Sequence, residues 1–147
     1  MLDGQSKPRL GALLTTAQET WRAALGEALT RRKAPLLGAG ADLLAQLSLA
    51  GISQSLLAER MGLSKQAVQQ SLDQLEKLAL VRRESDPVDR RANYVVLTQA
   101  GLYALEAGRE AEKEAEKLLR DALGKKTLKQ LAKGLRKLGA GRSAAGL

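Results

Sequence analysis

The sequence contains no cysteine and no histidine, and aromatic residues make up only 2% of its 147 positions. Without them the chain cannot form disulfides, thiol redox sensors, Cys/His zinc sites, or the Cys–His and Ser–His–Asp arrangements of nucleophilic catalysis. Catalysis by carboxylates alone stays open in principle, but the sequence has no paired-carboxylate or phosphate-loop motif. We therefore predict no metal, no cofactor and no enzymatic activity.

Leucine and alanine dominate the apolar residues, which make up 44% of the chain beside 27% charged residues. This balance is typical of a globular protein, and the length suits about one domain. Val and Ile are scarce, and Val81, Val88, Val95 and Val96 lie close together. Because Leu and Ala favour helices whereas Val favours strands, the composition predicts a mostly α-helical fold with one small β-sheet near residues 80–97.

Residues 34–52 form a largely apolar segment that nearly reaches the length of a transmembrane helix. Asp42 would lie mid-span, at a cost of roughly 2.5–3.5 kcal/mol in a bilayer, and Pro35 and Gly38 lower the hydrophobicity further. A core helix buried on most sides is therefore predicted instead of a membrane span. Residues 1–8 lack the charged start and apolar run of a signal peptide, and a cytoplasmic location is expected.

The formal net charge of +8 indicates an anionic partner, with nucleic acid as the first choice. Nearly all of the excess lies between Lys125 and Arg142, a segment without acids, whereas basic and acidic residues nearly balance over 53–93. Bulk charge therefore cannot assign DNA binding to the middle of the chain. For the basic segment 125–142 we favour a solvated helix face or a solubility role over direct DNA contact.

Four further segments carry helix patterns. Residues 9–32 have one apolar stripe at helical spacing, and a helix of about 35–50 would begin at Pro35 and be closed by Gly51. Thr98 can cap a long helix over 99–123, and Thr127 can cap a last helix before a flexible tail at 139–147. The leucines of this last helix are spaced as in a coiled-coil seam: Leu128, Leu131, Leu135 and Leu138.

The middle of the chain has the pattern of a helix-turn-helix followed by a hairpin. Ser53 and Ser64 can each cap a short helix, and Gly62 between these helices supplies the positive φ of a sharp turn. The second helix is expected over about 65–79, with Val68, Leu72, Leu75 and Ala79 facing inward. Strand patterns then follow at 80–84 and 94–97, separated by a charged turn cluster. This hairpin is expected to form a wing.

Residues 52–101 resemble the MarR family of winged helix-turn-helix transcription regulators. Three pieces carry the resemblance: LAERMGLSKQAV at the turn, DPVDRR in the wing, and VVLTQAG at the exit into the long helix. The family's usual layout has one helix before this region and two after it, which build a dimerisation domain. The resemblance thus implies a DNA-binding region at 34–97 and a helical dimerisation region at 9–33 and 98–138.

The resemblance implies that the second helix of the helix-turn-helix enters the major groove. The matching residues are Lys65, Gln66, Gln69 and Gln70, and Ser64 matches the position at the helix N-terminus that meets a phosphate. The chemistry agrees, because a Gln amide presents a donor and an acceptor side by side, as adenine requires. Helix N-terminal amides and a hydroxyl also suit a phosphate oxygen. The alternative for this surface is an ordinary solvated helix face.

For the wing, the resemblance implies that Arg91 enters the minor groove, that Asp89 orients it, and that Arg90 and Arg83 meet the DNA backbone. A guanidinium on a hairpin tip suits a narrow A·T-rich minor groove, where the potential is most negative. The alternative is a charged tip that keeps an exposed edge from pairing. Because Arg82 and Arg83 alternate in direction along a strand, at most one of them points to the DNA side.

The sequence therefore predicts a homodimeric regulator, interpreted as a repressor, that binds near-palindromic double-stranded DNA. Dimerisation is expected because the leucine stripes of the terminal helices exceed what one small reading domain can cover. The resemblance also raises the hypothesis that a small-molecule effector between the domains changes the spacing of the two reading heads. The effector's identity stays open: without Cys and His, thiol and His–zinc sensing are excluded, and the few aromatics disfavour a phenolic pocket.

Two alternatives keep the fold. One is a DNA-binding protein without an effector, such as an architectural protein, which would show no thermal shift with small acids or phenols. The other is a winged-helix module that binds protein instead of DNA.

Overall fold

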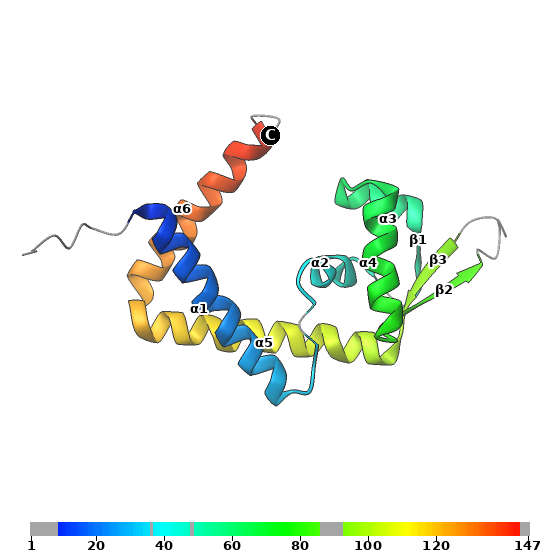
Figure 1. Cartoon of the computed structure of the whole chain (residues 1–147), viewed down its shortest axis with the longest axis horizontal. Helices are drawn as coiled ribbons and strands as arrows, with labels where there is room; N and C mark the ends of the chain where they lie inside the picture. Colours follow the sequence, from blue (N-terminus) through cyan, green and yellow to red (C-terminus); the bar gives the residue numbers. More distant parts are fainter. Residues whose placement is uncertain (1–8, 36, 48, 86–92, 145–147) are drawn as a thin grey trace, which may run out of the picture. The chain divides into compact units, whose positions relative to one another are not determined.

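The wing and the helix-turn-helix share one small sheet and one core. The computed structural model describes residues 9–35, 37–47, 49–85 and 93–144. They fall into two compact units: residues 29–110 form one, and the described residues of 1–28 and 111–147 form the other. Along the chain (Figure 1) the elements are α1 (Leu10–Arg31), α2 (Ala39–Ala45), β1 (Ile52–Ser53), α3 (Gln54–Met61), α4 (Lys65–Lys77), β2 (Val81–Ser85), β3 (Asn93–Leu97), α5 (Gln99–Leu123) and α6 (Lys125–Ala144).

The sheet has three antiparallel strands in the order β1-β3-β2. Strands β2 and β3 pair from Val81 opposite Leu97 to Ser85 opposite Asn93, as the predicted hairpin requires. Strand β1 was not predicted, because two residues are too short to show a strand period; its Ile52 pairs with Val95. The predicted fold class, mostly α-helical with a small β-hairpin wing, is confirmed, and β1 adds one edge strand.

The core of the unit formed by residues 29–110 lies between α4 and the sheet. Helix α4 buries Val68, Leu72 and Leu75, which recur at helical spacing, and the sheet contributes Val81 and Val95. These five side chains leave at most 2% of their surface exposed. Their burial fixes which face of α4 turns inward, and therefore which polar face is left for a partner.

Helix α2 is much shorter than the predicted helix of 35–50. Its N-cap residue Gly38 has φ 53°, which an α-helix cannot include, and Gln46 ends it. Leu43 and Leu44 are buried whereas Ala45 is exposed, so one face and not most sides of α2 is covered. In the described part of the chain, no helix combines the length and hydropathy needed to cross a bilayer.

Two other predicted helix ends need correction. Helix α4 stops at Lys77, and Ala79, expected to face inward, is exposed in a left-handed turn with φ 56°. Helix α6 begins at Lys125, before the expected cap Thr127, and it continues to Ala144. The expected flexible tail is thus helical over 139–144, where Ala and Arg residues offset the low helix propensity of glycine; residues 145–147 lie outside the described part.

The start of α5 is anchored on the turn that leads into β2. Thr98 caps the helix as predicted, because its Oγ1 accepts a hydrogen bond from the Gly101 amide at 2.9 Å. The same hydroxyl lies 2.7 Å from Ala79 O and 3.0 Å from Leu80 O, and the Thr98 amide donates to Leu80 O. At the other end, Gly124 has φ 77° and closes α5 as predicted.

Candidate nucleic-acid interface

The caps of α3 and α4 form the helix-turn-helix as the sequence predicts. Ser53 Oγ accepts from the Leu56 amide at 3.2 Å, and Ser64 Oγ accepts from the Ala67 amide at 3.1 Å. Between the helices, Gly62 has φ 62° and its amide donates to Ala58 O and Glu59 O. Each cap satisfies a backbone donor that the first helical turn leaves free. The short turn therefore sets the orientation of α4 relative to α3.

The four predicted readers of α4 are all exposed. Lys65, Gln66, Gln69 and Gln70 are exposed on the helix that buries Val68, Leu72 and Leu75. None of them is part of the core. Gln69 Nε2 donates to Asp73 Oδ1 at 3.2 Å, which leaves its second N–H and its carbonyl oxygen for a ligand. Ser64 is exposed at the helix start, where its hydroxyl already serves the cap.

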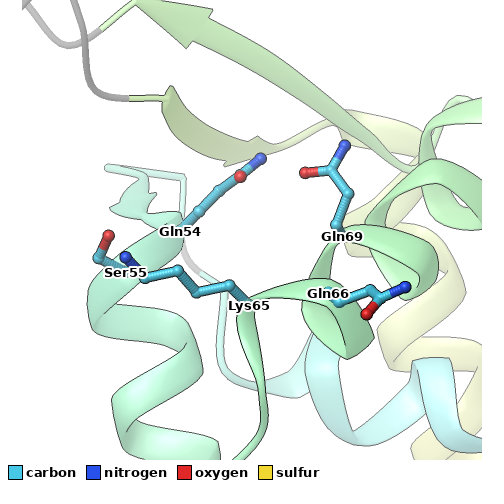
Figure 2. A pocket seen from close by; sticks show the side chains of 5 residues that line it. All are labelled: Gln54, Ser55, Lys65, Gln66 and Gln69. Carbon is cyan, nitrogen blue, oxygen red and sulfur yellow. The ribbon is translucent and has the colours of Figure 1, made fainter.

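An open hollow lies between the start of α3 and the start of α4 (Figure 2). Gln54 and Ser55 line it from α3, and Lys65, Gln66 and Gln69 line it from α4; its volume is about 320 Å³. Figure 2 shows Lys65 extending toward Ser55. Each of the five lining side chains ends in a polar group, and Lys65 adds one positive charge, which suits a phosphate or a base edge.

Gln54 and Ser55 are site residues that sequence reasoning missed. The Gln54 Nε2 atom is buried and has no hydrogen-bond partner among the described residues. A buried donor without a partner is costly. The Ser53 cap was the available signal, because it places the next two residues in the first turn of α3.

Arg83 needs a correction. It was expected to meet the DNA backbone, but its guanidinium points onto α4, where Nη2 is 2.6 Å from Asp73 Oδ1 and Nη1 binds Glu76 Oε2. The Arg83 side chain is 19% exposed, and both terminal nitrogens are engaged by carboxylates. Arg82, its neighbour on β2, is exposed and pairs with Glu84 at 2.6 Å. Two acidic residues of α4, Asp73 and Glu76, thereby share one positive charge supplied from within the protein.

The wing tip lies outside the described residues, which stop at Ser85 and resume at Asn93. The predicted roles of Asp89, Arg90 and Arg91 therefore stay predictions. In the described ranges on either side of this gap, no group of three acidic residues lies close enough to hold a metal ion.

An α2–α3–turn–α4 arrangement followed by a β-hairpin defines the winged helix-turn-helix class of protein. Residues 35–92 match the sequence model of the MarR family. The match confirms the resemblance at the turn and in the wing, two of the three pieces that carry it. The family that this model describes is one of transcription regulators.

Solved structures share the fold over most of the chain. A MepR–DNA complex from S. aureus is 20% identical, with a TM-score of 0.68, and the match covers 92% of this chain and 99% of that one. The transcriptional repressor CouR, bound to a 23-mer DNA duplex, is 24% identical, with a TM-score of 0.67 and coverage of 89% and 92%. Wild-type MarR from E. coli in its apo form is 22% identical, with a TM-score of 0.59 and coverage of 89% and 96%. No curated protein matches in sequence.

Proposed function

We propose that the protein is a sequence-specific, double-stranded DNA-binding transcription regulator that acts as a homodimeric repressor. The observation that carries the proposal is the exposure of Lys65, Gln66, Gln69 and Gln70 on a helix whose apolar residues are buried in the core. The MarR-family match over residues 35–92 supports it. So do the DNA complexes of MepR and CouR, two proteins with the same fold. We also infer a cytoplasmic location, because the DNA it would bind is there.

The chemistry of each side chain indicates which part of the DNA it would contact. Glutamine amides can read base edges in the major groove, where each base pair presents its own pattern of donors and acceptors. Lys65 suits a backbone phosphate, and contacts of this kind fix the register of the protein. Arg91 would add a minor-groove contact from the wing.

The homodimer is supported by the unit formed by the described residues of 1–28 and 111–147. There, the buried side chains are all alanines: Ala28, Ala111 and Ala115. Large apolar side chains are exposed instead, and they are Leu10, Leu13, Leu14, Leu118, Leu123, Leu131, Leu135 and Leu138. Three helices that bury no larger side chain lack a core of their own. A second copy would cover these leucines and place two reading heads on a near-palindromic site.

Release by a small-molecule effector completes the proposed cycle. An effector that binds one spacing of the two reading heads better than the other would shift the dimer toward that spacing.

The first test concerns Lys65 and the salt dependence of binding. In Lys65→Ala we expect weaker binding to all DNA sequences, and a slope of log affinity against log salt that is smaller by about 1 per site, because one phosphate contact is lost. Gel shifts or fluorescence anisotropy at several salt concentrations measure both quantities. Lys77→Ala, at the other end of the same helix, removes an equal charge from an exposed position and should leave the slope unchanged. Equal slopes in both variants would contradict a phosphate contact at Lys65.

The second test concerns the wing and decides between DNA and a protein as the partner. In Arg91→Ala we expect operator affinity to fall about tenfold or more, the size that one good contact supplies. A winged-helix module that binds protein would keep its affinity for DNA unchanged. The operator can be sought as a near-palindrome close to the protein's own coding region and confirmed by a gel shift.

A further inference from the structure

One carboxylate oxygen connects the wing strand to a predicted base reader. Asp73 Oδ1 accepts a hydrogen bond from Gln69 Nε2 at 3.2 Å and is also 2.6 Å from Arg83 Nη2. Gln69 and Asp73 lie one turn apart on α4, whereas Arg83 comes from β2. Glu76, nearly one turn further along α4, holds the other terminal nitrogen of Arg83. The guanidinium is thus clamped, and the carboxylate it binds touches Gln69.

The contact with Asp73 decides which way the Gln69 amide faces. A free glutamine amide can rotate by half a turn and exchange its donor and acceptor positions. An ionised carboxylate only accepts hydrogen bonds, so the Gln69 nitrogen must be the atom next to Asp73. The carbonyl oxygen and one remaining N–H are then presented at fixed places. Figure 2 shows the Gln69 amide on the wall of the hollow, with its oxygen turned toward Gln54.

Arg83 holds the Asp73 carboxylate beside the Gln69 amide. An aspartate on an exposed helix surface ordinarily samples several rotamers and is hydrated. Here Arg83 is less exposed than its partners, and its contact with Glu76 helps to hold the guanidinium in place. The guanidinium in turn restricts Asp73 to one position. Charge-assisted hydrogen bonds of this kind are also stronger and more directional than neutral ones.

We propose that Arg83 and Asp73 act as a positioning pair that orients the Gln69 amide and thereby sets the base preference of the recognition helix. A carbonyl oxygen held at a fixed place selects a base donor opposite it, which is the N6 amino group of adenine or the N4 amino group of cytosine. The pair also ties β2 to α4, so the wing strand and the base reader share one network. The proposal rests on the proposed function, since it assumes that Gln69 meets DNA.

The experiment measures base preference in the full-length protein. Binding to an operator library first locates the base pair whose preference is lost in Gln69→Ala. At that base pair, Asp73→Asn and Arg83→Gln should each lower the discrimination between bases about tenfold, with little change at other positions. Arg83→Lys, which can keep one charged contact with Asp73, should recover part of it. Arg82→Gln is the matched control, because Arg82 pairs with Glu84 and does not contact α4 through any hydrogen bond among the described residues.

The proposal also makes a claim that needs no DNA. In the free protein, the side-chain amide signals of Gln69 in a ¹H–¹⁵N spectrum should move in both Asp73→Asn and Arg83→Gln, and stay in place in Arg82→Gln. Unmoved signals, unchanged discrimination, or an affinity loss spread evenly over all base pairs would overturn the positioning role. If the wild-type protein itself shows no sequence preference, the proposed function fails and this inference fails with it. Preference in the wild type that survives in both variants overturns the inference alone.

Discussion

Leu135→Asp should convert the protein from a dimer to a monomer in solution. Leu131, Leu135 and Leu138 recur on α6 at helical spacing and are 41%, 47% and 65% exposed. A second copy that covers them would bury an aspartate at position 135 without a partner charge. Burying an unpaired polar or charged group costs several kcal/mol, and in a twofold dimer the cost arises twice.

Leu135→Asp should also lower operator affinity more than the removal of any single DNA-contacting residue would. A monomer presents one reading head, so it loses about half of the contacts to a two-half-site operator. We expect operator affinity to fall by about a hundredfold or more, well beyond what one mismatched base pair costs. Analytical ultracentrifugation at micromolar concentration reports the mass, and gel shifts on the same samples report the affinity.

The matched control is Leu78→Asp. Leu78 is 49% exposed, close to the value for Leu135, but it lies at the C-cap of α4 in the unit formed by residues 29–110. The same chemical change at the same exposure should leave the protein dimeric. A Leu135→Asp protein that stays dimeric, or an equal loss in both variants, would contradict the proposed dimer surface.

Gly101→Ala should strongly destabilise the fold. A Cβ atom at this position would overlap the backbone carbonyl of Leu80 and would lie 2.7 Å from Leu97 Cδ1. The Leu80 backbone cannot yield easily, because its amide donates to Leu75 O and its carbonyl accepts from the Thr98 amide. The first turn of α5 must therefore move away from the sheet. Overpacking of this kind costs about 1–3 kcal/mol and more where backbone is involved.

A second glycine on the same helix provides the control. Gly108 has no described atom within 4 Å of the place where a Cβ would stand. Gly108→Ala should raise the free energy of unfolding by about 0.5–1 kcal/mol, because alanine favours helix more than glycine does. Thermal melts should show a Tm lowered by roughly 5–10 °C in Gly101→Ala and raised by a few degrees in Gly108→Ala. Similar shifts in both variants would show that the close approach at Leu80 is not rigid.

The helix caps and the turns that end helices could be predicted from the sequence. The caps at Ser53, Ser64 and Thr98 and the left-handed turns at Gly62 and Gly124 are all where the sequence predicts them. Each depends on hydrogen bonds or φ angles within about four residues. The inward face of α4 was equally readable, because its apolar residues repeat with the helical period. Such features need no knowledge of what lies across the molecule.

Contacts between distant residues were decided only when the chain folded. Strand β1 exists because Ile52 meets Val95, and Arg83 pairs with Asp73 because β2 packs beside α4. Gln54 faces the hollow because the turn brings α3 against α4. A pattern of residue types states what each side chain can do, but an arginine suits a phosphate and a carboxylate equally well. Which of them it meets depends on the neighbour that packing places within reach.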